Sequence, residues 1–241
     1  LSGVKEPPQR RARRLMDFVK VFHEAMPLLL DGLKLTIGIA LLAIALGMVI
    51  GFLSCIMGMS KNPVLRAISA VYVWLIRGTP MLVQAFFVFY AIPQLVKVMT
   101  GTAFTLTPFT AGAITLSLNA GAYISEIFRG GIQAVPKGQT EAARSLGLSS
   151  AKTMLRVVLP QAFKIAIPSL VNQFIITVKD TSILSVIGLA EVVNRAKQYV
   201  GSTFSFFATY VYVGALYLVV ISLLMVLSRR IEKRMSYDRK G

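Results

Sequence analysis

Long apolar runs alternate with charged segments along the chain. The first run, about residues 35–58, is uncharged and about 23 residues long, enough for a helix to cross a bilayer with some tilt. Within it, Gly47-x-x-x-Gly51 permits close helix packing, although such spacing also arises by chance in apolar runs. Further runs cover about residues 64–96, 109–128, 165–190 and 206–228. The pattern predicts an all-α polytopic membrane protein with about five transmembrane helices.

The segment ahead of the first span has a different pattern. Between residues 15 and 30, apolar side chains recur at helical spacing and charged side chains occupy the other faces, which predicts a helix lying in the membrane interface. Residues 1–14 are basic and have no apolar core, so they are not an intact signal peptide. We expect a basic tail and interfacial helix at 1–30, a transmembrane domain at 31–235 and a cytoplasmic tail at 236–241.

The second apolar run is interrupted by the polar sequence Arg77-Gly78-Thr79-Pro80. A helix break frees backbone N–H and C=O groups, and these are tolerated at membrane depth only where protein or water meets them. We therefore expect this break to be buried in protein or to line a water-filled space.

The positions of the basic residues predict the orientation of the chain. Segments 61–66, 129–164 and 229–241 hold fourteen Lys and Arg residues, whereas segments 95–108 and 186–205 hold three. Because basic loops stay on the cytoplasmic side, the first group and the C-terminus are predicted to lie inside. The seven basic residues up to Lys34 disagree with this orientation, unless the interfacial helix folds back onto anionic lipid.

Composition supports a membrane domain and argues against one alternative. Of the 241 residues, 55% are hydrophobic and 15% are charged, and the net charge is +16. A nucleic-acid-binding protein would carry such a charge as a stripe on a soluble surface, but here it borders apolar runs. We expect no nucleic-acid partner. The single cysteine, Cys55, lies within an apolar run and can form no intrachain disulfide.

The basic segment 129–164 carries a spaced motif, Glu141-Ala142-Ala143-x3-Gly147-x9-Val157-x-Leu159-Pro160. It resembles the EAA loop of ABC importer permeases, with valine at 157 as the one departure. A short helix that starts near residues 139–140 and ends at the glycine would form a knob for a cleft on another protein. The alternative is an ordinary amphipathic loop helix. The resemblance implies that a partner ATPase contacts Glu141, Ala142, Ala143, Gly147, Leu159 and Pro160.

Four other segments extend the resemblance over about residues 28–235. Residues 30–36, 77–84, 122–132 and 179–182 are similar to the polar amino acid permeases, the subunits of histidine, glutamine, arginine and cystine importers. The resemblance implies a type I importer fold in the bacterial cytoplasmic (inner) membrane and uptake of polar amino acids by alternating access. It also implies an identical or related second permease subunit, an external substrate-binding protein and two ATPase subunits. ATP and Mg²⁺ would bind to the ATPases, and this chain would hold no cofactor.

Polar residues inside the apolar runs are candidates for the substrate path. The Lys179-Asp180 pair should face a cavity, a partner or substrate, and it complements both charges of an amino acid; a self-neutralising structural pair is the alternative. Arg77 suits a substrate carboxylate or snorkels to the interface. Asn119 and Tyr123, four residues apart, line the path or make interhelical hydrogen bonds. With the positions that the resemblance adds, the candidates are Arg77, Thr79, Gln84, Asn119, Tyr123, Lys179, Asp180, Thr181 and Ser182.

Two other classes of function compete with this interpretation. A membrane-embedded enzyme or scaffold would need no EAA-like loop, and the sequence shows no catalytic triad, metal cluster or phosphate loop. Gly147-x4-Lys152-Thr153 lacks the second glycine of a P-loop. A secondary transporter is also possible, but five spans make an uneven count for an inverted repeat. The sequence therefore predicts a translocation subunit without catalytic residues of its own.

Overall fold

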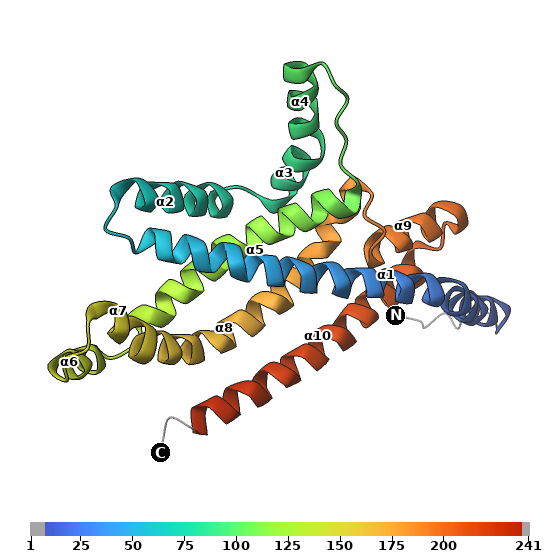
Figure 1. The fold of residues 1–241 in the computed structure, drawn as a ribbon. Helices are drawn as coiled ribbons and strands as arrows, with labels where there is room; N and C mark the ends of the chain where they lie inside the picture. Colours follow the sequence, from blue (N-terminus) through green and yellow to red (C-terminus); the bar gives the residue numbers. More distant parts are fainter. Residues whose placement is uncertain (1–7, 238–241) are drawn as a thin grey trace, which may run out of the picture.

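A computed structural model describes residues 8–237 of the chain, with side chains for residues 17–233, and every regular element in this part is helical (Figure 1). The first half contains α1 (Pro8–Gly58), α2 (Pro63–Gly78), α3 (Met81–Phe86), the π-helix η1 (Phe87–Ala91), α4 (Ile92–Thr100) and α5 (Pro108–Gln133). The second half contains α6 (Lys137–Ser145), α7 (Ser150–Thr153), the π-helix η2 (Met154–Val158), α8 (Leu159–Asp180), the 3₁₀ helix η3 (Thr181–Ile187), α9 (Val192–Thr203) and α10 (Phe206–Tyr237). Most of the predicted C-terminal tail, and the start of the basic N-terminal tail, lie outside the described residues.

Four helical segments of the described chain are long and apolar enough to cross a membrane: Asp17–Gly58, Met81–Thr100, Ser150–Ile187 and Phe206–Lys233. They correspond to four of the five predicted spans. The fifth, α5, forms where it was predicted but is rich in Gly, Ala, Ser and Thr, and it packs on α1, α8 and α2. Small residues suit this central position, because they allow the neighbouring helices to approach closely. The predicted all-α membrane fold is confirmed.

The first helix differs from the prediction of an interfacial helix followed by a separate span. Residues 8–58 form one helix of 51 residues with Pro27 inside it. Its first turns run in a different direction from the rest (Figure 1). Pro27 lies within the helix and removes one of its hydrogen bonds, so the helix accommodates it without ending. Val21, Ala25 and Leu29, at helical spacing, are buried in a cluster with residues of α9 and α10. Protein therefore covers the side of this segment that carries these three residues, whereas Val19 and Phe22 remain exposed.

Two close contacts hold the middle of the bundle together. A Cβ atom added at Gly51 would lie 2.7 Å from the carbonyl oxygen of Gly121, so α1 approaches α5 along the predicted Gly47-x-x-x-Gly51 face. Nearby, Ser69 Oγ donates to the Ser54 carbonyl at 2.7 Å, and Ser125 Oγ donates to Ser54 Oγ at 3.2 Å. These three buried serines tie α2 and α5 to α1, and so fix the two helices that carry the first wall of the site described below.

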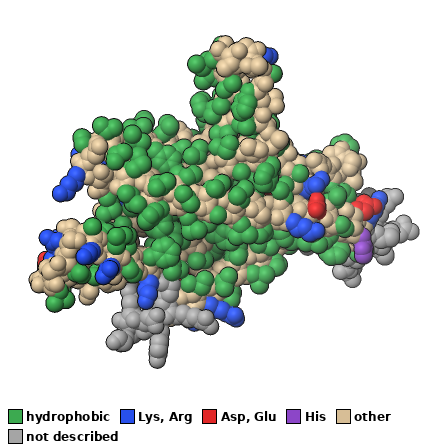
Figure 2. All heavy atoms as spheres, viewed as in Figure 1, with side chains coloured by type: hydrophobic (Ala, Val, Ile, Leu, Met, Phe, Trp, Pro, Cys, Tyr) green, Lys and Arg blue, Asp and Glu red, His purple; other side chains and the backbone are tan. Residues whose placement is uncertain are grey.

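Charge and apolar surface are segregated along the molecule. Hydrophobic side chains cover the middle of the bundle, whereas blue Lys and Arg side chains gather toward the end that carries α6 and α7 (Figure 2). This distribution agrees with the orientation predicted from the loop charges, in which α6 and α7 lie on the cytoplasmic side.

Candidate functional site

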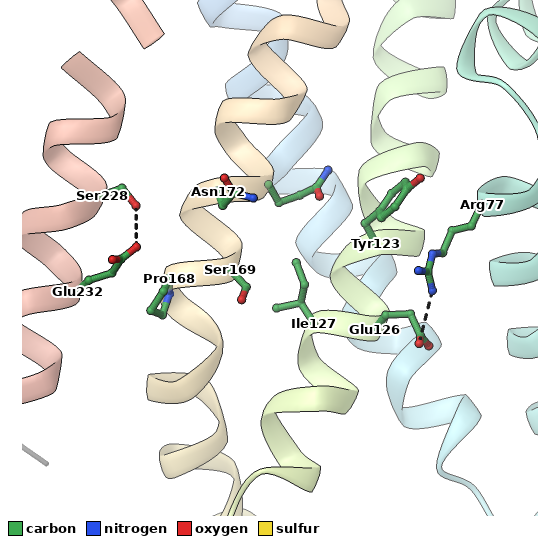
Figure 3. Close-up of a pocket in the computed structure, with 10 residues that line it drawn as sticks. Arg77, Tyr123, Glu126, Ile127, Pro168, Ser169, Asn172, Ser228 and Glu232 are labelled. Atoms are coloured by element: carbon green, nitrogen blue, oxygen red, sulfur yellow. Dashed lines mark hydrogen bonds and ion pairs between the residues drawn. The ribbon is translucent and has the colours of Figure 1, made fainter. Parts of the chain in front are cut away.

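A cavity of about 570 Å³ opens between α2, α5, α8 and α10. Figure 3 shows Arg77 of α2 on one side and the Ser228–Glu232 pair of α10 on the other, with α5 and α8 between them. The lining residues are Arg77, Tyr123, Glu126, Ile127, Pro168, Ser169, Asn172, Gln173, Ser228 and Glu232. The site thus combines charged, amide and hydroxyl side chains between membrane helices, where such groups are costly unless they face water, protein or a ligand.

The predicted helix break lies at one edge of this cavity. α2 ends at Gly78, and Thr79 and Pro80 are extended before α3 begins. Gln84 Nε2 donates to the carbonyl oxygens of Ile76 at 2.7 Å and Thr79 at 3.0 Å, and Asn119 Nδ2 donates to Gln84 Oε1 at 3.0 Å. Protein therefore meets the freed backbone groups, as the break requires. Thr79, Gln84 and Asn119 form a network that ties the break to α5, and they are not among the cavity-lining residues.

Arg77 extends from the last turn of α2 into the cavity. Its Nη1 atom lies 3.5 Å from Glu126 Oε2, and its Cζ atom lies 5.3 Å from the centre of the Tyr123 ring. Arg129, one turn further along α5, binds both carboxylate oxygens of Glu126, with Nε 3.1 Å from Oε1. Two guanidinium groups thus share one carboxylate, which leaves a net positive charge at this wall of the cavity.

The opposite wall contributes one carboxylate, that of Glu232. Glu232 accepts a hydrogen bond of 3.2 Å from Ser228 Oγ within α10. Between the two walls, α8 contributes Ser169 and the exposed amide of Asn172. The cavity therefore offers a guanidinium at one end, a carboxylate at the other and neutral hydrogen-bonding groups between them.

Residues 179–182 lie beyond the cavity lining. Asp180 is the last residue of α8, and the hydroxyls of Thr181 and Ser182 donate to the carbonyl oxygens of Val178 and Lys179 within the same segment. Lys179 is exposed, seven residues along α8 from the exposed Asn172. Seven residues are two helical turns, so the two side chains share a face of α8 about 10 Å apart. The structure thus brings Arg77 and Tyr123 together but does not bring residues 179–182 into the same site.

Sequence analysis missed most of the far side of the cavity. The polar pair Asn172-Gln173 inside the run at 165–190 was a signal that would have added α8 residues to the set. Ser228 and Glu232 gave no such signal, because they lie at the charged end of the last span. Only the packing of α10 beside α8 places them at the cavity.

The EAA-like segment forms a compact helical loop. α6 begins two residues earlier than predicted and ends just before Gly147, whose φ of 81° lies in the left-handed region. Leu148 N donates to the Ala143 carbonyl at 3.2 Å and Gly147 N to the Arg144 carbonyl at 3.0 Å, which is a Schellman motif. Glu141 and Ala142 are exposed, while Ala143 is buried.

The boundaries of this loop are narrower than the predicted 129–164. α5 continues to Gln133, and α8 begins at Leu159 with Pro160 in its first turn, where proline is well tolerated. Leu159 and Pro160 therefore lie in the first turn of α8, where Pro160 is exposed.

Comparison with known proteins identifies the class of this chain. Residues 43–237 match the family model described as the binding-protein-dependent transport system inner membrane component. The glutamine transport system permease protein GlnP of Escherichia coli (strain K12) is 37% identical over 211 residues, which cover 88% of this chain and 94% of the relative. The L-cystine transport system permease protein TcyB of Bacillus subtilis (strain 168) is 40% identical over 210 residues, covering 87% of each.

Solved structures agree. A chain of an amino acid ABC transporter solved with histidines has a TM-score of 0.84 and 35% identity, and the match covers 90% of this chain and 98% of that one. A chain of the MetNI methionine ABC transporter, at 20% identity and a TM-score of 0.71, shares the fold. The chain therefore belongs to the family of binding-protein-dependent transport system inner membrane components. It is a permease subunit of an ABC importer with the type I fold, a translocation component whose ATPase is a separate subunit.

Proposed function

We propose that this permease imports polar amino acids and that they pass through the cavity between α2, α5, α8 and α10. The observation that carries the proposal is the separation of charge across this cavity, with Arg77 at one wall and Glu232 at the other. An amino acid has a carboxylate and an ammonium group, and the two walls complement both. The relatives named for glutamine and cystine support the same substrate class.

Each wall has a separate role in this proposal. The guanidinium of Arg77 binds the substrate carboxylate, because its nearest acidic neighbour, Glu126, is already bound by Arg129. The ammonium group lies toward Glu232, and Ser169 and Asn172 offer hydrogen bonds to a polar side chain. Lys179 and Asp180, further along α8, continue the path toward the external side.

Energy enters through the cytoplasmic loop. In the proposed assembly, two ATPase subunits bind ATP and Mg²⁺, and each receives the α6 helix of a permease subunit. Closure of the ATPases moves the paired α6 helices together and switches the bundle between inward- and outward-facing states around the cavity. A second permease subunit and an external substrate-binding protein complete the importer, in the bacterial cytoplasmic membrane.

Uptake by the reconstituted importer tests the role of Arg77. In liposomes containing the permease, its ATPase and its binding protein, Arg77→Gln should lower amino acid uptake by about tenfold or more, since hydrogen bonds to charged groups contribute about 1.5–3 kcal/mol. Arg66→Gln is the matched control, because Arg66 is an exposed arginine on the same helix that does not line the cavity. Equal uptake by both variants and the unmodified protein would exclude this cavity as the substrate path.

A further inference from the structure

A second hollow, of about 700 Å³, lies on the loop side of the molecule between the end of α5, α6 and the α7–η2 segment. One wall is a single face of α6, formed by Lys137, Thr140, Glu141 and Arg144. Their spacing of three and four residues places all four side chains on one side of the helix. The hollow is therefore part of the EAA-like loop and separate from the cavity in the bundle.

The floor of this hollow is mainly apolar and contains one buried hydroxyl. Val135, Val158 and Met154 line it together with Thr153. The Thr153 side chain is 2% exposed, and its Oγ1 atom has no hydrogen-bond partner among the described residues. A buried hydroxyl without a partner costs about 1–3 kcal/mol, so such a group usually has a partner that completes it.

The charges of the wall indicate the chemistry of that partner. Lys137 and Arg144 lie at the two ends of the α6 face. Arg144 Nη1 donates a hydrogen bond to the Leu148 carbonyl oxygen at 3.0 Å, which fixes the position of its guanidinium group. Two basic groups against one carboxylate, Glu141, favour an acidic segment. The apolar floor favours a side chain with an apolar body, and Thr153 supplies a hydrogen bond at its end.

Leu146 favours a protein over a small molecule as the occupant. This leucine is 84% exposed at the end of α6, in a loop predicted to lie in water and not in lipid. A protein partner can bury this side chain together with the basic face of α6, which a small molecule in the hollow cannot do.

We propose that an acidic segment of the ATPase inserts a side chain with an apolar body and a polar end into this hollow, and that the polar end forms a hydrogen bond with Thr153. The inference rests on the proposed coupling role of the loop and adds a reciprocal contact to it. The loop helix enters the ATPase, and the ATPase in turn fills the space behind the helix.

Filling the hollow in advance tests the proposal. Ser150 is exposed at its rim, so Ser150→Trp should reduce the ATPase that copurifies with the detergent-solubilised permease by about tenfold or more. Lys61→Trp is the control, because Lys61 is exposed in the predicted cytoplasmic turn between α1 and α2, away from the hollow. Thr153→Val should weaken the complex about three- to tenfold, the contribution of one hydrogen bond, and Thr153→Ser should weaken it less.

Labelling gives a second measurement that does not depend on how the tryptophan variant folds. In a Cys55→Ser background, Ser150→Cys should react with maleimide in the isolated permease and be protected in the complex, while Lys61→Cys reacts in both. Full ATPase retention by Ser150→Trp, or labelling of Ser150→Cys at equal rates with and without ATPase, would overturn the proposal. So would retained ATPase with an altered hydrolysis response to free amino acids, which would indicate a small-molecule site.

These outcomes are distinct from failure of the proposed function. The docking measurements need no substrate. If the unmodified importer takes up no amino acid but Ser150→Trp loses the ATPase, the substrate assignment alone fails. If uptake is normal and Ser150→Trp keeps the ATPase, the hollow alone is wrongly assigned.

Discussion

At the scale of single residues, Glu191 shows how a carboxylate is kept inside this fold. The side chain is fully buried at the start of α9, where it accepts hydrogen bonds from Val193 N at 2.9 Å and Asn194 N at 2.7 Å. Burial raises the pKa of Glu191 above its ordinary value of 4.5, although these hydrogen bonds oppose the rise. A raised pKa means that the fold binds the proton more tightly than the unfolded chain does.

The raised pKa predicts the pH dependence of stability. The contribution of Glu191 is fully present below pH 4.5 and is lost as pH rises through the higher pKa of the folded state. Glu191→Gln should remove this loss. The thermal unfolding temperature of the variant in detergent should therefore fall less than that of the unmodified protein as the pH rises above 4.5. If the variant loses a capping hydrogen bond, its unfolding temperature is lowered by the same amount at every pH. The prediction concerns the slope of unfolding temperature against pH. Parallel curves for the two proteins would contradict it.

Gly147 is the residue whose backbone most constrains the loop. Its φ of 81° ends α6, and a side chain in this region costs about 1 kcal/mol or more. Gly147→Ala should therefore distort the end of α6 and reduce ATPase copurification and substrate-stimulated hydrolysis. Gly130→Ala is the control, because Gly130 lies in α5 outside the proposed docking helix, a Cβ there meets no described atom within 4 Å, and the position needs no positive φ. The loop end would not be a coupling element if both variants behaved like the unmodified protein.

At the scale of helices, the α1–α5 contact depends on the absence of a side chain. A Cβ at Gly51 would lie 2.7 Å from Gly121 O and 2.8 Å from a methyl group of Ile124, so the helices must move apart to admit it. Gly51→Ala should lower the free energy of unfolding by about 1–3 kcal/mol, the usual cost of overpacking. Gly38→Ala, on the same helix but with open space at its Cβ, should be neutral or slightly stabilising. Thermal unfolding in detergent compares the two, and equal losses would show that the contact is not tight.

The sequence predicted the positions and ends of helices well, but it did not predict contacts between helices that are far apart in the chain. Apolar runs predicted the spans, and Gly147 and Thr79-Pro80 predicted where helices end, because these signals are local. The continuity of α1 through Pro27 was not predicted, since the apolar face that it buries is completed by α9 and α10. For Asn119 the sequence left open an interhelical hydrogen bond, but local pattern could not name its partner, Gln84 on another helix.

At the scale of the whole molecule, α5 connects the cavity to the loop. Tyr123 and Glu126 line the cavity, and the same helix continues to Gln133, which lines the hollow behind α6. α8 also connects the two places, but it runs from the loop to the cavity. It follows directly on η2 at the hollow and carries Asn172 at the cavity. A displacement of α6 by the ATPase would therefore act on both helices that form the middle of the substrate site. Both lie in one packed unit, since α5 and α8 contact each other.

This arrangement fixes which end of the molecule must face the ATP-containing compartment, and thiol labelling tests it. In a Cys55→Ser background, we expect Thr102→Cys to react with a membrane-impermeant maleimide in intact cells and Ser150→Cys to react only after permeabilisation. Both positions are exposed, so a difference between them reports sidedness more than burial. The reason is the charge distribution: residues 95–108 hold one basic residue and residues 129–164 hold six, and basic loops stay inside. The reversed labelling pattern would place α6 outside, away from any cytoplasmic ATPase, and would remove the physical basis for coupling through this loop.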